Sequence, residues 1–527
     1  MLTLARMQDL LRHIQQDFVG LDRCDAVMSL DGRVGQRRRI YLDSTATALM
    51  PRPVLRGVQT YFERASANSH TAAHRAGRAT TEAIEETRRA LGELVGWDPR
   101  RDVVLLEGNG ATGAINFLAR ALFPPELRAP LKRALGEEGR ELARALVKTA
   151  PSLRSRMEGM LSRPLVVLSR LEHHSNILPW VEAVGRHHVR VVDTTPDGRF
   201  DLDHYERILR QEGHRVRVVA VTGASNVTGV LTPLDEIAAR AHAVGAQVMV
   251  DAAQLAPHRP IRMHGGGQNL DFVVVSGHKL YAPGSRGALI GPLEETGCVC
   301  AGDVGGGMVE FVSLDDYQIK NEITQREEAG TPNIPGTIAL GMAALLLQRI
   351  DMARIAAAEE ALVGYALERL AAIEGLRLYG PLDPSARVGV IALNVVGLHH
   401  AVVARYLDDT HAVCVRSGCF CAHPYVQALL ACTDEAEEAY RRQVSAGDRS
   451  ALPGMVRLSF GLYNTRDDVD AACAALAEAV RRRDQIREAY LVDRSGNAQR
   501  RDLRAPPKVF SLVDGLNAAL SAPHPAS

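Results

Sequence analysis

Five short apolar runs, separated by longer amphipathic stretches, constrain the fold of this chain more than any other feature. The runs occupy residues 103–106, 165–168, 216–221, 247–250 and 272–275. Each run is apolar at nearly every position, as strands must be when both faces of a parallel sheet are covered. Stretches between them, such as 81–95 and 234–244, repeat apolar residues every three or four positions, as helices do. The pattern predicts an α/β fold whose large domain has a mainly parallel central sheet.

A smaller α+β domain is predicted at the C-terminal side of the large one. Residues 339–370 are almost all helix formers, so one long connecting helix is expected. Strand patterns follow at 388–396 and 456–460, and a helix pattern at 469–483. The predicted organisation has four parts: a helical segment over 1–39, the large domain over 40–345, the small domain over 346–485 and a loosely ordered tail over 486–527. A charged helical insertion is expected within the large domain at about 124–163.

Composition excludes several classes of protein. Lysine plus arginine and aspartate plus glutamate each number 62 in the 527 residues, so the charge balance gives no support to nucleic-acid or membrane-surface binding. No apolar run approaches the length of about 18 residues that a membrane span needs. Eight cysteines are too few for a disulfide scaffold. A soluble cytoplasmic enzyme with a small-molecule substrate is expected.

Residues 273–279 (VVVSGHK) place Lys279 just after a predicted buried strand. Ligands of α/β enzymes bind at the carboxyl ends of the strands, and a desolvated lysine amine is a nucleophile. The alternative is an ordinary surface lysine on a loop.

Residues 248–254 (VMVDAAQ) place Asp251 at the end of the preceding strand, with Gln254 close behind. Asp251 is either a helix cap or a buried carboxylate that pairs with a cation such as the pyridine nitrogen of pyridoxal phosphate (PLP).

Two further motifs follow predicted strands. Residues 107–116 (EGNGATGAIN) form a glycine-rich turn that opens a helix, an arrangement that suits phosphate. The turn also spells G-x-G-x-x-G, but no second strand ending in an acidic residue follows about 20 positions on, so a phosphate loop is favoured over a dinucleotide site. Residues 172–180 (EHHSNILPW) place His173 and His174 after the strand at 165–168. Either histidine could stack on a cofactor ring or be a satisfied core residue.

Nine blocks in this order resemble the class V aminotransferase family of fold-type I PLP enzymes, most closely the group II cysteine desulfurases and selenocysteine lyases. The blocks are YLDSTAT, GATGAIN, EHHSNILPW, SNVTG, DAAQ, SGHKLYAPG, EEAGTPNIPG, VRSGCFCAHP and VRLSFGLYN, spread from about residue 40 to 470. By this resemblance Lys279 binds PLP covalently, Asp251 pairs with the pyridine nitrogen and Gln254 lies near the phenolic oxygen. His173 is expected to stack on the ring and act as acid or base.

The same resemblance implies a phosphate site and a dimer. Thr112, Ser276 and His278 match phosphate ligands, and Ala111 stands in this loop where the family usually has a hydroxyl residue. Thr331 matches a residue that completes the phosphate site of the other protomer. A homodimer is therefore expected.

Cys421 decides which reaction the resemblance implies. It matches the nucleophile of group II desulfurases, while Asn226 and Arg457 match residues that hold the substrate carboxylate, Asn226 also bordering the cofactor. The expected reaction converts L-cysteine to L-alanine and leaves a persulfide on Cys421 for a sulfur-acceptor protein. A cation near Cys421 would stabilise its thiolate, and Arg416 and His423 are the candidates.

Other interpretations of these residues stay open. Cys421 could be a buried apolar cysteine in another class V enzyme, a C–S lyase or aminotransferase. Zinc binding by Cys414, Cys419 and Cys421 has no standard ligand spacing, and no metal is expected. The segment GCFC also resembles molybdenum cofactor sulfurases and replaces the histidine that group II desulfurases carry before the cysteine. An inactive scaffold of the same fold is a further alternative, which the retained lysine, aspartate, glutamine and arginine disfavour.

Overall fold

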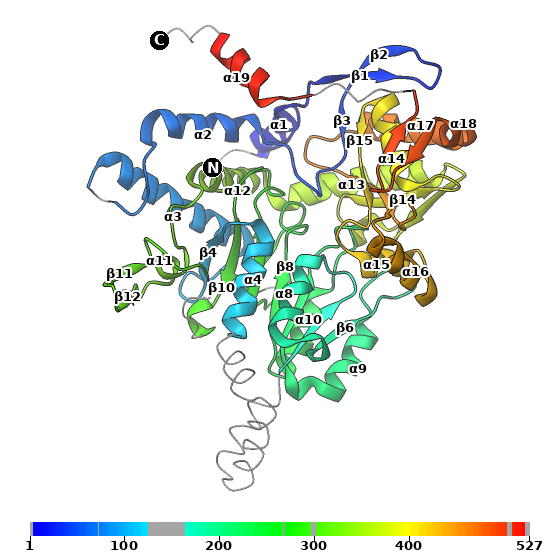
Figure 1. Cartoon of the computed structure of the whole chain (residues 1–527). Coiled ribbons are helices and arrows are strands. Elements are labelled where there is room, and N and C mark those ends of the chain that lie inside the picture. The colour runs from blue at the N-terminus through cyan, green and yellow to red at the C-terminus, as the bar shows by residue number, and fades with distance from the viewer. Residues whose placement is uncertain are drawn as a thin grey trace.

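The computed structural model describes residues 4–71, 73–124, 164–265, 267, 269–296, 302–502 and 509–521. The expected insertion at 124–163 lies outside these residues from position 125 onward. The chain forms a large unit around one broad sheet and a smaller unit around a second sheet (Figure 1). The pocket described below lies at the edge of the large sheet that faces the small unit.

Within the described part of the chain the large sheet has seven strands, and all but one run in the same direction. In spatial order they are β4 (Val103–Glu107), β10 (Gly287–Gly291), β9 (Phe272–Ser276), β8 (Gln247–Asp251), β7 (Val216–Thr222), β5 (Leu165–Ser169) and β6 (Val189–Val192). Only β10 is antiparallel to its neighbours. The five predicted strands and the mainly parallel sheet are confirmed, and β6 and β10 are additions.

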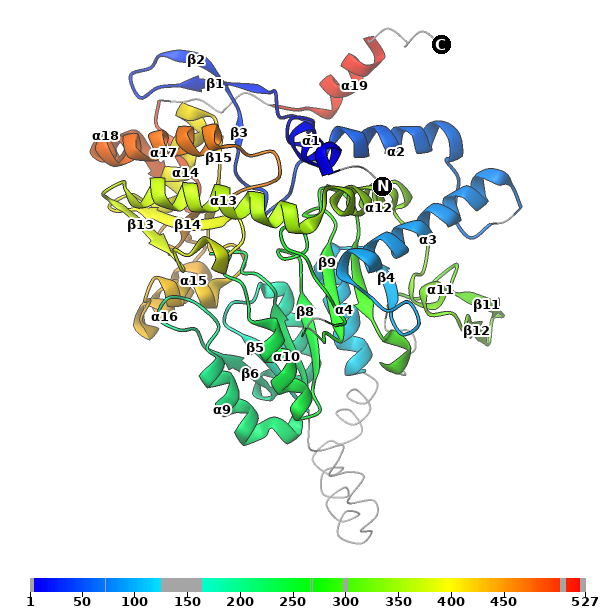
Figure 2. The ribbon, with the colours of Figure 1, turned by 180° about the vertical axis from the view of Figure 1, so that it is seen from behind.

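Both faces of this sheet are covered, which explains the continuous apolar runs. In β5, Val167 packs into one core, whereas Val166 and Leu168 pack into another on the opposite face. The first core is closed by α3 (Arg75–Val95) and α12 (Ile334–Ile350) and the second by α4 (Gly110–Leu122) and α8 (Leu178–Val184). The remaining helices of this unit are α2 (Arg52–Ala65), α9 (Leu202–Glu212), α10 (Leu234–Ala243) and α11 (Ile323–Glu327), and a hairpin of β11 (Val309–Val312) and β12 (Tyr317–Ile319) lies beside α11 (Figure 2).

The single long helix expected over 339–370 is wrong, because the chain breaks at Asp351. α12 ends at Ile350 and α13 covers Met352–Ala371. Asp351 has φ 82°, and its carboxylate accepts a hydrogen bond from the Ala353 amide at 2.8 Å, which caps α13. Helix propensity alone does not reveal a break that is made by one local side-chain hydrogen bond.

The small unit has an antiparallel sheet of four strands with helices on it. The order is β13 (Leu376–Tyr379), β14 (Val390–Val395), β17 (Met455–Ser459) and β16 (Arg416–Gly418). The helices after α13 are α14 (His400–His411), α15 (His423–Leu429), α16 (Asp434–Ser445), α17 (Arg466–Arg481) and α18 (Arg483–Ala489). Near the N-terminus, β3 (Ile40–Tyr41) pairs in parallel with β15 (Val413–Cys414), and this pairing carries the following loop to the pocket.

The two ends of the chain lie outside these sheets. The segment 1–39 was expected to be helical, but over its described residues 4–39 only α1 (Leu4–Gln15) is an α-helix, and β1 (Cys24–Met28) and β2 (Val34–Arg38) form a hairpin. β18 (Tyr490–Val492) and β19 (Ala498–Arg500) form another, whose buried Arg500 donates to the Met28 carbonyl at 2.7 Å. α19 (Leu512–Ser521) stands apart with its apolar side chains exposed (Figure 1). Within the described residues, no helix is both long and apolar enough to cross a membrane.

Candidate active site

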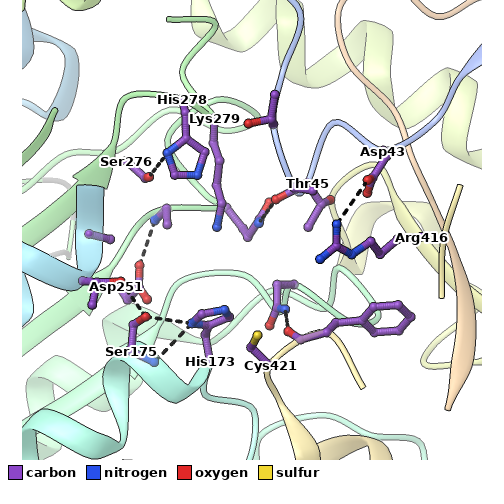
Figure 3. A pocket seen from close by; sticks show the side chains of 18 of the residues that line it. Asp43, Thr45, His173, Ser175, Asp251, Ser276, His278, Lys279, Arg416 and Cys421 are labelled. Atoms are coloured by element: carbon purple, nitrogen blue, oxygen red, sulfur yellow. Dashed lines mark hydrogen bonds and ion pairs between the residues drawn. The ribbon is translucent and has the colours of Figure 1, made fainter. Parts of the chain in front are cut away.

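One cavity of about 470 Å³ collects almost all of the predicted site residues (Figure 3). They come from the carboxyl ends of the large sheet's strands and from the small unit. The predicted residues that line the cavity are Ala111, Thr112, His173, Asn226, Asp251, Gln254, Ser276, His278, Lys279, Cys421 and Arg457. Thr331 does not line it; this side chain is exposed and accepts a hydrogen bond from Asn68 at 3.4 Å.

Lys279 follows β9 in a tight turn. The Lys279 amide donates to the Ser276 carbonyl at 3.1 Å, and the Gly277 amide to the Arg286 carbonyl at 3.1 Å. A Cβ at position 277 would lie 2.3 Å from that carbonyl oxygen, so only glycine fits there. Desolvation lowers the pKa of Lys279 to about 8, with Asp251 opposing the shift. With this pKa, about one tenth of the amine is unprotonated at pH 7 and about half at pH 8, and the unprotonated form can accept a proton.

Asp251 and Gln254 form the buried floor of the cavity. Asp251 ends β8 and accepts a hydrogen bond from the Ala253 amide at 3.0 Å. Burial raises the pKa of Asp251, and Lys279 opposes the shift. The Gln254 amide nitrogen donates to the Thr45 carbonyl at 3.0 Å, while its Oε1 is buried without a hydrogen-bond partner among the described residues. Both side chains can thus accept a further hydrogen bond from a group bound in the cavity.

His173 is held in one neutral tautomer. Its Nδ1 accepts the Ser175 amide at 3.1 Å, so the ring proton lies on Nε2. Desolvation lowers the pKa of His173 to about 3, and Lys279 adds to the shift. The Ser175 hydroxyl lies 2.7 Å from the Thr112 hydroxyl and 3.1 Å from His173 Nδ1. Ser175 therefore links the predicted ring-stacking residue to the predicted phosphate loop.

The glycine-rich turn opens α4 at the cavity. Its helix begins at Gly110, and the N-cap Asn109 makes no side-chain capping bond, so the first amides of the helix are available to an anion. Ser276 and His278 lie against this turn: a Cβ on Gly110, which has φ 62°, would lie 3.0 Å from the Ser276 hydroxyl. Among the described residues β4 pairs only with the antiparallel β10, so no adjacent parallel strand of the kind that a dinucleotide fold requires is found there.

Arg457 is a buried cation on β17. It donates to the Asn226 carbonyl at 2.9 Å and to Asp43 at 3.1 Å, and its guanidinium lies over the Phe420 ring at 4.7 Å. Burial lowers the pKa of Arg457 to about 10, so the side chain remains charged at neutral pH. Its Nε is buried without a partner among the described residues. This cation can bind a substrate carboxylate.

Cys421 lies in a strained turn at the cavity's small-unit side. The Ala422 amide donates to the Cys419 carbonyl at 2.9 Å, and Phe420 and Cys421 between them have φ 53° and 54°. Left-handed backbone costs a non-glycine residue about 1–2 kcal/mol, so tertiary contacts must hold the turn. Cys421 is exposed and its sulfur is directed among the lining side chains (Figure 3).

Asn226 holds this turn. Its Nδ2 donates to the Phe420 carbonyl at 2.7 Å, so in this structure Asn226 positions the cysteine segment rather than facing the cavity as a free donor.

Of the two cations expected beside Cys421, Arg416 lines the cavity, 3.9 Å from Asp43. Burial lowers the pKa of His423, so this imidazole is neutral at neutral pH.

The zinc interpretation has no structural support. The Cys419 thiol lies 3.0 Å from the Pro453 carbonyl, and the Cys414 thiol lies 3.9 Å from Asp408. Among the described residues, no group of three or more histidine, cysteine or acidic side chains is arranged to hold a metal ion.

Several lining residues received no role from the sequence. They are Tyr41, Asp43, Thr45, Ala46, Thr47, Asn109, Ser175, Thr222, Ala253 and Phe420. Tyr41 ends β3, and four of them (Asp43, Thr45, Ala46 and Thr47) belong to the loop after it, which the pairing of β3 with β15 carries over Lys279. The Ala48 amide of this loop donates to the His278 carbonyl at 3.0 Å. The block YLDSTAT marks this loop, but nothing in its residue types indicates that it covers a lysine more than 200 positions away.

Comparison with known proteins identifies the relationship. The model of the family "Aminotransferase class-V" matches residues 40–131 and 153–472, which is more than half of the chain. The chain belongs to the class-V aminotransferase family. The unmatched residues 132–152 fall within the expected insertion, and the family predicted from the sequence is confirmed.

Within this family the chain is similar to cysteine desulfurases. A cysteine desulfurase of Klebsiella pneumoniae (strain 342) is 32% identical over 449 residues, covering 85% of this chain and 95% of the relative. A probable cysteine desulfurase of Halalkalibacterium halodurans is 31% identical over 450 residues, covering 85% of this chain and 94% of the relative. The solved apo structure of a cysteine desulfurase from Thermococcus onnurineus NA1 matches with a TM-score of 0.66 and 29% identity, over 84% of this chain and 95% of that one. The predicted fold class is thereby confirmed.

Proposed function

We propose that this chain is a PLP-dependent cysteine desulfurase that converts L-cysteine to L-alanine and leaves the sulfur as a persulfide on Cys421. One observation carries the proposal: a single cavity brings together a desolvated lysine, a buried carboxylate, a buried arginine and an exposed cysteine. The relatives that match most of the chain are named cysteine desulfurases. A C–S lyase or aminotransferase would need the first three of these groups but not the cysteine.

The cavity fits PLP at each end. The buried Oε1 of Gln254 has no hydrogen-bond partner among the described residues and would accept from a phenolic O–H. The Asp251 carboxylate, which accepts the Ala253 amide, would also accept from a protonated pyridine nitrogen. His173 would lie on the ring and Lys279 would attach the cofactor. Phosphate would bind at the first turn of α4, with its ligands drawn from Thr112, Ser276, His278 and the Ala111 amide. When bound, PLP supplies an electron sink that makes the α-proton of an amino acid acidic.

The chain's own residues account for the rest of the reaction. Arg457 binds and orients the carboxylate of L-cysteine. Lys279, with a pKa of about 8, moves the proton at the substrate α-carbon. Cys421 attacks the substrate sulfur: an S–S bond forms, the Cβ–S bond breaks, and Cβ gains a proton to become the methyl group of alanine. Overall, L-cysteine and the Cys421 thiol give L-alanine and the Cys421 persulfide.

The remaining parts of the proposal concern the assembly. The exposed Thr331 would complete the phosphate site of a second copy, so we place the enzyme as a homodimer. The persulfide needs an acceptor, and a sulfur-acceptor protein would collect it. A reducing cytoplasm suits this chemistry, because all six described cysteines are free. We propose a large domain over 40–345 and a small domain over 346–485. The junction between residues 345 and 346 falls inside α12.

The test is product analysis with L-cysteine and a thiol reductant. Wild-type enzyme loaded with PLP should form alanine and sulfide in equal amounts, and Cys421→Ser should form neither. Cys24→Ser, which changes another exposed free cysteine, is the matched control and should behave as wild type. Pyruvate and ammonia, or unchanged turnover in Cys421→Ser, would refute the desulfurase.

The cofactor is tested separately. Borohydride reduction followed by peptide mass spectrometry should find PLP on Lys279 and nowhere else, and Lys279→Ala should lose the label. Lys320, which lies in the peptide that follows β12, is the control lysine and should carry none. A label that persists in Lys279→Ala would contradict the PLP assignment.

A further inference from the structure

Two imidazoles outside the predicted catalytic set lie against each other behind Cys421. His174 begins the short 3-10 helix His174–Asn176 of the large unit, and His423 is the first residue of α15 in the small unit. Their rings stack with centroids 4.9 Å apart and planes 12° apart. The His423 amide donates to His174 Nε2 at 3.3 Å, and His423 Nδ1 lies 3.1 Å from the same nitrogen. The pair therefore joins the two units directly beside the cysteine turn.

The hydrogen bonds assign the tautomers of both rings. A backbone amide can only donate, so His174 Nε2 must accept and the proton of His174 lies on Nδ1. His423 Nδ1 faces that acceptor and must carry its own proton. His174 is thus neutral in this arrangement, and burial, which lowers the pKa of His423, favours the neutral form of that ring as well. Burial lowers the pKa of each of them, and the two rings reinforce the effect on His174.

The pair is connected to the nucleophile through the backbone. The His174 amide donates to the Cys421 carbonyl at 2.7 Å, while Asn226 holds the neighbouring Phe420 carbonyl. Phe420 and Cys421 both have unfavourable positive φ, so these two bonds oppose the relaxation of the turn. His173, which precedes His174, lines the cavity itself. A shift of His174 would therefore move both the cysteine and the ring-stacking histidine.

We propose that His174 and His423 form a positioning pair that holds the turn of Cys421 in its reactive conformation. Neither His174 nor His423 lines the cavity, and the pair acts through the backbone of Cys421. This inference rests on the proposed desulfurase reaction for its kinetic consequence, although not for its structural one.

Protonation should open the pair. A proton on His174 Nε2 would turn the acceptor into a donor that faces two other donors, the amide and the ring nitrogen of His423. The other titratable groups near the pair are His173, whose ring centroid is 6.2 Å from that of His174, and Cys421. No carboxylate among the described residues forms a hydrogen bond or ion pair with either ring. A protonated pair therefore has no carboxylate partner among the described residues, and the turn should loosen as pH falls below the ordinary histidine pKa of about 6.5.

The structural arm of the test uses hydrogen–deuterium exchange of the holoenzyme. His174→Leu removes the acceptor, so the peptide that contains residues 421–423 should exchange at least fivefold faster than in wild type. His174→Gln places an amide oxygen near the position of Nε2 and should restore most of the protection. His187→Leu, at an exposed histidine of the same unit, is the matched control and should leave this peptide unchanged. Equal exchange in wild type and His174→Leu would overturn the proposal.

The kinetic arm follows alanine formation from L-cysteine between pH 5 and 8.5. In His174→Leu, kcat should fall about tenfold at pH 8 while KM for L-cysteine changes less than twofold, because the carboxylate site is untouched. In His174→Gln, kcat should fall less steeply than in wild type as pH is lowered, since the glutamine amide cannot be protonated. An acid limb identical in wild type and His174→Gln would contradict the pair's role. If wild type forms no alanine, the proposed function fails, and the exchange measurement still decides the pair.

Discussion

Glu172 offers a stringent test of the electrostatics beneath the site. This residue follows β5, immediately before His173, and its carboxyl group is completely buried. The Ser169 hydroxyl donates to one oxygen, and Asn176 Nδ2 donates to the other at 2.6 Å. Asn176 in turn accepts the Trp180 indole N–H at 2.9 Å. The Thr222 backbone also donates to this carboxyl group. Glu172→Gln keeps the shape of the side chain but cannot ionise; its amide oxygen can accept from Asn176, and its amide nitrogen can donate to the Ser169 hydroxyl.

Burial raises the pKa of Glu172 to about 8 from an ordinary value of 4.5, although hydrogen bonds from Ser169 and Asn176 oppose the shift. Between these two values the folded protein holds a proton that the unfolded chain has released. The free energy of unfolding therefore falls as pH rises, by about 1.4 kcal/mol per pH unit and by about 3–4 kcal/mol between pH 5 and 8. The stabilising contribution is complete below pH 4.5 and is lost as pH passes through 8. Glu172→Gln lacks this term and should become the more stable protein at alkaline pH.

The assay is thermal melting of wild type and variant at matched pH values. For 527 residues that melt together, the difference in Tm between the two proteins should change by about 3 °C from pH 5 to 8, in favour of Glu172→Gln. Glu368→Gln, at an exposed glutamate of α13, is the control and should track wild type throughout. Parallel Tm curves for wild type and Glu172→Gln would show that Glu172 does not hold a proton in the folded state.

Two further predictions concern the cavity wall. Arg457→Lys removes the planar guanidinium that contacts both Asn226 and Asp43. Initial-rate measurements should therefore show KM for L-cysteine rising at least tenfold, equivalent to about 1.4 kcal/mol, with a smaller loss of kcat. An unchanged KM would mean that the substrate carboxylate binds elsewhere. Burial raises the pKa of Cys419 to about 11, so iodoacetamide should label the exposed Cys421 faster than Cys419 at pH 7.5. Labelling of Cys419 should accelerate about tenfold per pH unit up to pH 10, and peptide mapping that finds equal rates for the two cysteines at pH 7.5 would contradict this ordering.

The strands and the gathering of the site were predictable from the sequence for the same physical reason. A strand buried on both faces must be apolar throughout, and parallel strands present their carboxyl ends at one edge. Asp251 and Ser276 each directly follow a predicted run, so their proximity follows from topology. The direction of β10 does not follow in this way, because the apolar residues of Gly287–Gly291 suit either orientation. Asp351 likewise interrupts a helical pattern through a bond that periodicity does not encode.

The contacts that complete the site join segments hundreds of positions apart. Asp43 meets Arg457, and Gln254 meets the Thr45 carbonyl, only because β3 pairs with β15 of the small unit. A two-residue pairing such as β3 with β15 carries too little pattern to be read from the sequence. The resemblance to a family identified these segments as matching blocks, but it did not predict the contacts between them.

The conformation of Cys421 shows why residue identity alone was insufficient. Glycine at a positive φ would have signalled a sharp turn, but here phenylalanine and cysteine occupy two successive left-handed positions. The large unit holds both of their carbonyls, through Asn226 and the amide of His174, while Arg457 of the small unit covers the Phe420 ring. Because these restraints come from both units, a movement of one unit against the other would relax the turn and withdraw the sulfur. The reactivity of Cys421 should therefore depend on the closed arrangement of the two units as well as on the residues around the thiol.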